Sequence, residues 1–164
     1  MILLKNILVA TDFGDASDAA LAYGRDLARS YFARMHVLHV ADDVMIRFAS
    51  EFSMAALPDI QARLEEAARD RMQAAVTEED RNVLRAKPVV VTSIAPADAI
   101  VDYARTHAID LIVMGTHGRR GFDHLLMGSV AERVVRTAPC PVLTVRHPER
   151  EFVVPDALVA VAKA

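Results

Sequence analysis

The sequence predicts an α/β protein built on a single open five-stranded parallel sheet, with helices on both faces. Five short runs rich in β-branched residues alternate with segments whose apolar residues have helical spacing. Most of these runs are nearly continuous in apolar residues, as in strands that are covered on both faces. The intervening segments are long enough for helices of ten or more residues, and strands separated by such helices form parallel sheets.

The five strands are expected over residues 6–11, 35–40, 87–92, 110–115 and 141–146. Four helices are expected between them. The first covers 15–32, where Ala19, Tyr23 and Leu27 fall near one apolar stripe. The second covers 57–84 and is so rich in Glu and Arg at three- and four-residue spacing that one face is expected to be solvated. The third covers 95–108 and starts with Pro96, which suits a first helical turn, and the fourth covers 128–138.

No linker or internal repeat divides this pattern, so we expect one domain over residues 1–146. Residues 147–164 form a C-terminal extension with two apolar stretches, "FVV" and "ALVAVA". The extension is too short to cross a bilayer. A disordered tail is one interpretation. The apolar stretches favour the other, in which the extension packs on the sheet edge or on another subunit.

Composition argues against several classes of function. The net charge is -3 and no long basic run occurs, so nucleic acid is not an expected partner. No segment has the roughly 20 uninterrupted apolar residues of a membrane helix, and the start of the chain does not read as a signal peptide. The single cysteine, Cys140, excludes an internal disulfide, and we expect it to be buried. These features predict a cytoplasmic protein without a membrane partner.

A glycine-rich stretch after the fourth strand is the main candidate for a binding site. Gly115 and Gly118 follow that strand, and Gly128 precedes a helix that starts near Ser129. Ligands of open α/β sheets bind beyond the carboxyl ends of the strands. If the first and fourth strands are neighbours, Asp12 and Gly115 face the same crevice. Glycines permit positive φ and close approach to backbone N–H groups, and a helix N-terminus favours phosphate.

Charged side chains in the same stretch could strengthen an anion site, but a simpler interpretation also stands. Arg119, Arg120 and His117 could donate to a phosphate. Equally, the stretch could be only a turn, with Ser129 and Glu132 forming a capping box for their own helix. The stretch contains no lysine and no G-x-G-x-x-G follows the first strand, so it matches neither a P-loop nor a Rossmann fingerprint.

The spacing of these glycines resembles the ATP-binding motif of the universal stress protein family. Gly115-x2-Gly118-x9-Gly128-Ser129 matches that family's G-2x-G-9x-G-[S/T] pattern. The resemblance extends from Lys5 to about residue 146. It includes "ILVATDFGDASDAALAYGRDLA", "VLHV", "DLIVMGTHGRRG" and "PCPVLTVR".

The resemblance implies an adenine nucleotide alpha hydrolase-like fold with strand order 3-2-1-4-5. It also implies that the end of the first strand contacts the nucleoside, that Val40 lies against adenine, and that Met114 forms the pocket floor. Ala10 departs from the proline that is frequent there in the family. With His117 added on chemical grounds, the expected nucleotide-binding residues are Ala10, Thr11, Asp12, Val40, Met114, Gly115, His117, Gly118, Arg119, Gly128, Ser129 and Val130. Magnesium or manganese is expected to bridge the ATP phosphates without a protein metal site. A homodimer is expected through the fifth strand.

Two functions remain open at this stage. The first is a regulatory module of the stress response, in which bound ATP modulates a dimer or a partner interaction. The second is a slow ATPase or phosphotransferase, which needs a base or an oriented water near the γ-phosphate. Asp12 is assigned to the nucleoside end, and loop histidines such as His117 and His124 are usually exposed, so no catalytic residue is identified.

His36 and His39 are interpreted as structural. A phospho-acceptor receiver domain is disfavoured, because no aspartate ends the third strand.

Overall fold

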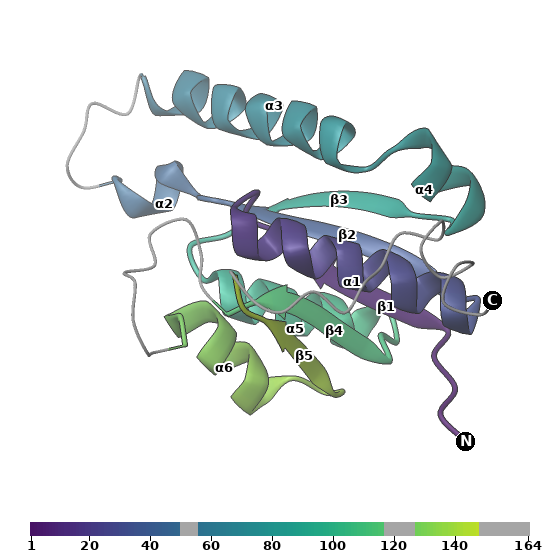
Figure 1. The fold of residues 1–164 in the computed structure, drawn as a ribbon. Helices are drawn as coiled ribbons and strands as arrows, with labels where there is room; N and C mark the ends of the chain where they lie inside the picture. The colour runs from purple at the N-terminus through teal and green to yellow at the C-terminus, as the bar shows by residue number, and fades with distance from the viewer. Residues whose placement is uncertain (50–55, 117–126, 148–164) are drawn as a thin grey trace.

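A computed structural model of the chain describes residues 1–49, 56–116 and 127–147. Five strands form one parallel sheet in the order β3-β2-β1-β4-β5 (Figure 1). The strands are β1 (Asn6–Ala10), β2 (Arg34–Ala41), β3 (Lys87–Thr92), β4 (Leu111–Gly115) and β5 (Val142–Val145). The predicted fold class and strand order are therefore confirmed.

Strand β1 lies at the centre of the sheet and pairs with β2 on one side and β4 on the other. Ile7, Leu8 and Val9 have no exposed surface, because successive side chains point to opposite faces and both faces are covered. This double burial explains why the strand sequence is continuously apolar. It also places the carboxyl ends of β1 and β4 side by side, with Ala10 opposite Met114.

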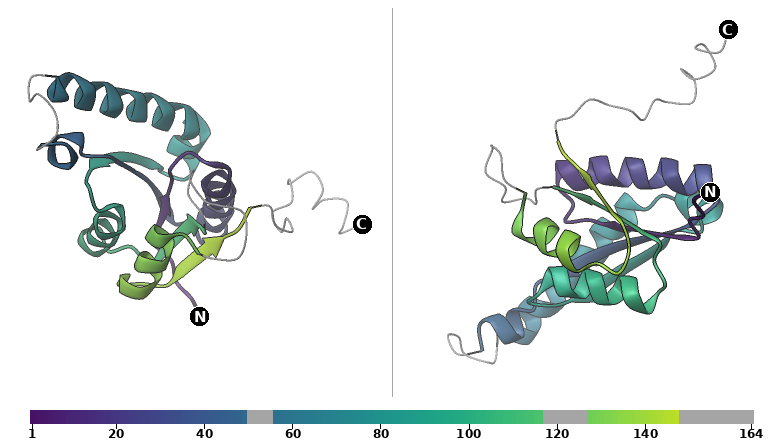
Figure 2. Two further views of the ribbon diagram at one scale, coloured as in Figure 1. Left: turned by 90° about the vertical axis from the view of Figure 1, so that its left-hand side faces the viewer. Right: turned by 90° about the horizontal axis from the view of Figure 1, so that it is seen from below.

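Two layers of helices cover the sheet (Figures 1 and 2). The first layer contains α1 (Asp15–Tyr31) and α3 (Leu57–Ala75), and its core includes Ala20 and Met72 packed with Val37. The second contains α5 (Pro96–Thr106) and α6 (Ser129–Thr137), whose core includes Ile100 and Val134. Each layer buries the apolar stripe of its helices against one face of the sheet.

The helix expected over residues 57–84 is interrupted. Helix α3 ends at Ala75, and a separate helix α4 (Glu78–Val83) follows. Thr77 and Asp80 form a capping box, in which the Thr77 hydroxyl accepts the Asp80 N–H at 3.1 Å and the Asp80 carboxylate accepts the Thr77 N–H at 2.9 Å. Val76 is extended and fully buried. The chain therefore turns into the core before a new helix begins.

One short helix differs from the expected pattern: α2 (Val44–Arg47) follows β2 and was not predicted. Cys140 is partly exposed rather than fully buried, and burial raises the pKa of its thiol. Within the described ranges, no helix is long and apolar enough to cross a membrane. Residues 148–164 of the predicted extension 147–164 lie outside the described residues, so the division of the chain at residue 146 stays a prediction.

Candidate functional site

A cavity of about 680 Å³ opens at the carboxyl ends of β1, β2 and β4. The first turns of α5 and α6 close its other side. The chain leaves the end of β1 toward one face of the sheet and the end of β4 toward the other. The cavity lies at this switch point, which is where open α/β sheets bind ligands.

Nine of the twelve sequence-predicted site residues line this cavity: Ala10, Thr11, Asp12, Val40, Met114, Gly115, Gly128, Ser129 and Val130. The other three, His117, Gly118 and Arg119, lie outside the described residues. The structure thus brings together two segments that are about a hundred residues apart in the sequence. The role of each residue in binding remains a prediction.

Eight further residues line the cavity and were not predicted: Ser17, Leu38, His39, Arg47, Pro96, Ile100, Thr116 and Ala131. Thr116 and Ala131 are chain neighbours of predicted residues and could have been found by extending the motif. Pro96 was recognised only as a helix start. Arg47 belongs to α2, a four-residue helix too short to show a periodic signal in the sequence.

The loop between β1 and α1 forms one wall of the cavity and is tightly hydrogen-bonded. The Thr11 hydroxyl accepts the N–H of Phe13 at 2.9 Å, and the Asp12 carboxylate accepts the N–H of Gly14 at 3.1 Å. Ser17, in the first turn of α1, accepts the same Gly14 N–H at 3.0 Å and lies 3.1 Å from the Thr11 hydroxyl. These bonds hold Thr11 and Asp12 at the end of β1.

Helix α6 begins without a side-chain cap. Its N-cap is Gly128, and Ser129 is the first helical residue, as expected. The alternative in which Ser129 and Glu132 form a capping box is not observed. The carbonyl of Gly128 accepts the first helical bond, from the N–H of Glu132 at 2.9 Å. Among the described residues, no side chain at the N-cap accepts the N–H groups of the first turn, and these groups lie at the cavity end of the helix. This is the arrangement that favours an anion.

Gly115 is required for a different reason from the one expected. No glycine among the described residues has a positive φ. A Cβ atom at Gly115 would instead lie 2.9 Å from the carbonyl carbon and from the Cβ of Ala16 in α1. Glycine thus allows α1 to pack closely against the end of β4.

Backbone hydrogen bonds hold the residues on either side of 117–126 at the end of the sheet. The N–H of Thr116 donates to the carbonyl of Val145 at 2.8 Å, and the N–H of Gly128 donates to the carbonyl of Thr116 at 2.7 Å. The end of β4 and the start of α6 are consequently adjacent at the cavity.

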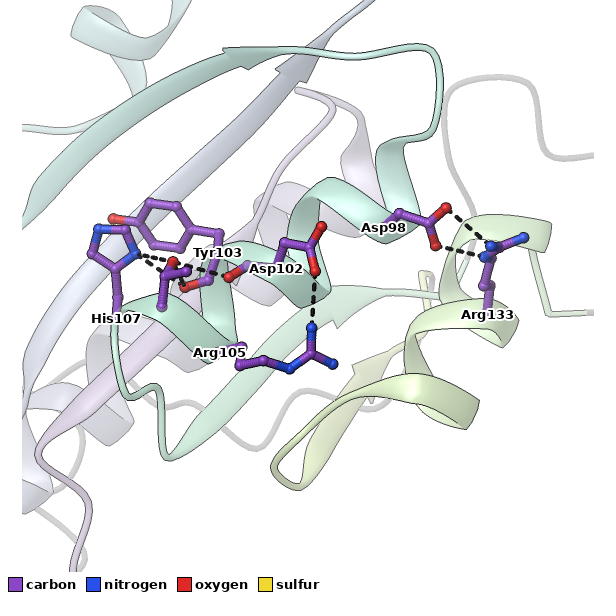
Figure 3. A network of polar contacts seen from close by, with 7 residues as sticks. Asp98, Asp102, Tyr103, Arg105, His107 and Arg133 are labelled. Carbon is purple, nitrogen blue, oxygen red and sulfur yellow. Dashed lines mark hydrogen bonds and ion pairs between the residues drawn. The ribbon is translucent and has the colours of Figure 1, made fainter.

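Helices α5 and α6 are joined near their cavity ends. Arg133 donates from Nε and Nη2 to the two carboxylate oxygens of Asp98, at 2.8 and 2.9 Å (Figure 3). Asp98 lies in the first turn of α5, and Arg133 lies in α6. The two parallel hydrogen bonds join the middle of α6 to the first turn of α5 on the exposed surface.

Three described residues of the cavity wall have side chains that can carry charge: Asp12, His39 and Arg47. Arg47 donates from Nε and Nη2 to one oxygen of Asp42, at 2.9 and 2.7 Å. The Nδ1 atom of His39 lies 2.9 Å from the carbonyl of Thr11. A search of the described residues finds no group of three His, Cys, Asp or Glu side chains that could hold a metal ion.

His36 does not line this cavity and contacts Tyr103, which lies near the end of α5 away from the cavity. Its Nδ1 lies 2.8 Å from the Tyr103 hydroxyl, and its Nε2 is buried without a described partner. Burial, together with the nearby charges of Lys87, His107 and Arg34, lowers the pKa of His36 to about 4. Burial raises the pKa of Tyr103. The rings of His107 and Tyr103 stack, with their centroids 3.9 Å apart.

Comparison with known proteins places this chain in a family. The universal stress protein family matches residues 4–146. The chain belongs to the universal stress protein family. A universal stress protein from Thermus aquaticus is 36% identical over 148 residues, covering 88% of this chain and 100% of the relative.

Solved universal stress proteins have the same fold. UspA from Lactobacillus plantarum is 31% identical with a TM-score of 0.69, covering 89% of this chain and 100% of that one. A universal stress protein solved in complex with cAMP is 24% identical with a TM-score of 0.56, covering 88% and 98% of the two chains. One from Archaeoglobus fulgidus, solved in complex with dAMP, is 22% identical with a TM-score of 0.56, covering 88% and 99%.

Proposed function

We propose that this universal stress protein binds ATP with magnesium or manganese in the cavity described above, and that occupancy modulates a dimer or partner interaction in the stress response. The observation that carries the proposal is the uncapped N-terminus of α6, which opens into the same cavity as Thr11 and Asp12. A helix N-terminus with unsatisfied N–H groups supplies the positive potential that phosphates need. The adenine nucleotides bound by two solved relatives support this choice of ligand.

The cavity offers distinct surroundings to the parts of such a ligand. Leu38, Val40 and Ile100 supply an apolar region suited to a base, and the β1–α1 loop supplies polar groups for the ribose. Gly128 and Ser129 lie at the phosphate end. The metal would be held by the phosphates.

Binding without rapid turnover is proposed ahead of an enzymatic role. Among the described cavity residues, Asp12 is the only carboxylate, and one of its oxygens already accepts the N–H of Gly14. General-base catalysis at the γ-phosphate needs a group within reach of the attacking water. Repeated ATP turnover by the pure protein would instead support the slow ATPase or phosphotransferase.

Mass spectrometry of the native protein and calorimetric titration with ATP and magnesium test the proposal. We expect an adenine nucleotide to co-purify or to bind with a Kd of about micromolar. Gly128→Leu should abolish binding, because the added side chain fills the phosphate end. The backbone at Gly128 has φ -60° and ψ 147°, which any residue adopts, so the variant should fold.

Arg136→Ala is the matched control. Arg136 lies in the last turn of α6, far along the helix from the cavity, and its exposed side chain pairs with Glu132. This variant should bind ATP as the wild type does. The proposal fails if the wild-type protein neither carries nor binds an adenine nucleotide.

A further inference from the structure

Phe13 holds an unusual backbone conformation in the loop that carries Thr11 and Asp12 into the cavity. Its φ is 61°, in the left-handed region. For a residue with a Cβ atom this conformation costs about 1–2 kcal/mol, and a bulky residue keeps it only when its surroundings stabilise it. Phe13 itself is not part of the cavity wall. The contacts that hold Phe13 therefore control how its two neighbours are presented to a ligand.

Arg71 of helix α3 contacts Phe13 in two ways. Its guanidinium carbon lies 4.5 Å from the centre of the Phe13 ring, which is the geometry of a cation–π contact. Its Nη2 also donates a hydrogen bond to the Phe13 carbonyl at 3.2 Å. One side chain thus restrains both the ring and the backbone of the same residue. Arg71 is only partly exposed, so water screens these contacts less than on an open surface.

Strand β2 supports the same loop through His39. The rings of His39 and Phe13 lie 4.4 Å apart at an interplanar angle of 35°. The Nδ1 atom of His39 is 2.9 Å from the carbonyl of Thr11. The aromatic ring of Phe13 consequently has one partner from α3 and one from β2, two elements that are distant from the loop in the sequence.

We propose that Arg71 is a positioning residue for the nucleoside end of the cavity, acting through Phe13 to hold Thr11 and Asp12 in their binding geometry. This inference rests on the proposed function. Arg71 does not line the cavity, so its action is indirect. The loop lies at the end assigned to the nucleoside, whereas the phosphates are assigned to α6. Loss of Arg71 should therefore weaken the binding of adenosine and ATP by the same factor.

Calorimetric titration of Arg71→Ala with adenosine and with ATP plus magnesium tests this inference. We expect both Kd values to rise about tenfold, corresponding to loss of one cation–π contact and one charge-assisted hydrogen bond. The ratio of the two Kd values should not change. Arg69→Ala is the matched control, because Arg69 lies on the same helix, is exposed, and pairs only with Glu65 in the described structure.

A double-mutant cycle with Phe13→Gly separates positioning from general loosening. Glycine adopts positive φ without cost and has no ring. In the Phe13→Gly background the Arg71→Ala change should therefore raise the adenosine Kd by less than it does in the wild type. A general loss of stability would instead give additive effects. Should Arg71→Ala fail to fold, Arg71→Gln replaces it, because glutamine retains much of the side-chain stem. The same changes in the two Kd values are expected for that variant.

Three outcomes would overturn the inference. One is that Arg71→Ala binds both ligands as Arg69→Ala does. Another is that the loss affects ATP alone, which would assign Arg71 to the phosphates. The third is additivity in the cycle. If the wild type binds neither adenosine nor ATP, the proposed function itself fails, which is a distinguishable result.

Discussion

At the scale of single residues, His36 shows how burial sets a protonation state. Its side chain is buried in β2, with Nδ1 against the Tyr103 hydroxyl and Nε2 enclosed. Burial and the positive charges nearby lower its pKa from 6.5 to about 4. The folded protein therefore holds this imidazole neutral in a pH range where the unfolded chain binds a proton.

This difference predicts a loss of stability in mild acid. The free energy of unfolding should fall as the pH drops from about 6.5 to about 4, because the unfolded state binds the extra proton. The contribution of His36 over that window is about 3 kcal/mol. Urea denaturation at a series of pH values measures it. His36→Leu should flatten the profile in this window, and an unchanged slope in that variant would exclude His36 as the source.

Gly115 illustrates a residue whose identity is set by a neighbouring element. Because an added Cβ atom would lie 2.9 Å from backbone and side-chain atoms of Ala16, Gly115→Ala should cost about 1–3 kcal/mol of stability. The midpoint of chemical denaturation measures this cost. Gly128→Ala is the control and should cost less, since Gly128 has an ordinary extended backbone. Equal costs in the two variants would contradict the packing explanation.

At the scale of elements, an ion pair ties α1 to the break between α3 and α4. Arg25 donates to both carboxylate oxygens of Asp80, at 2.8 and 2.7 Å, and also to the carbonyl of Ala75. Burial by itself raises the pKa of Asp80. The hydrogen bonds and charge of Arg25 and the hydrogen bonds of Thr77 outweigh it and lower the pKa. The pair thus holds the junction of the two helices against the first helix.

Breaking this pair should destabilise the fold. Asp80→Asn should lower the free energy of unfolding by about 3 kcal/mol, because Arg25 loses its counter-charge. The single amide oxygen of Asn also cannot accept at both positions that the two carboxylate oxygens of Asp80 now fill for Arg25 and Thr77. Glu79→Gln is the control: Glu79 is exposed and pairs with the exposed Arg29, so it should change stability by less than about 0.5 kcal/mol. Thermal and urea denaturation of both variants compare them. Similar losses would show that burial of the pair is unimportant.

The predicted and observed elements show which features of this fold can be predicted from neighbouring residues in the sequence. The bounds of the five strands were predicted to within one residue, because each strand is a short run rich in apolar, β-branched residues. The break at Val76 was missed although "TEED" is a capping signal, since the surrounding charge pattern continues through it. The role of Gly115 could not be predicted, because it depends on Ala16, which is distant in the sequence. The helix start near Ser129 was predicted correctly, whereas Gly128 and not Ser129 takes the N-cap.

At the scale of the molecule, the β5 edge of the sheet is the candidate dimer interface. Among the described strands, β5 pairs with β4 alone, and Val142, Leu143 and Thr144 are partly exposed. An unpaired edge strand is a template for pairing with another chain. We therefore propose a homodimer through β5, in agreement with the expectation from the sequence.

Sedimentation equilibrium tests this assembly. The wild type should sediment as a dimer, and Thr144→Lys should shift it toward the monomer, because a lysine on an edge strand opposes pairing. Lys87→Thr, on the opposite edge strand β3, is the control and should leave the mass unchanged. A monomeric wild type, or a dimer that is lost only in the β3 variant, would rule out the β5 interface.

The bond between Gly128 and Thr116 has a consequence for how this family can diversify. It holds Thr116 and Gly128 together, with the Gly128 nitrogen 2.7 Å from the Thr116 carbonyl oxygen, although eleven residues separate them in the sequence. The entropy of closing a loop changes only slowly with its length, by about 0.6 kcal/mol for each doubling. Insertions or deletions between these two anchors should therefore be tolerated by the fold itself. We therefore propose that ligand preference can change between these two anchors while the sheet stays the same.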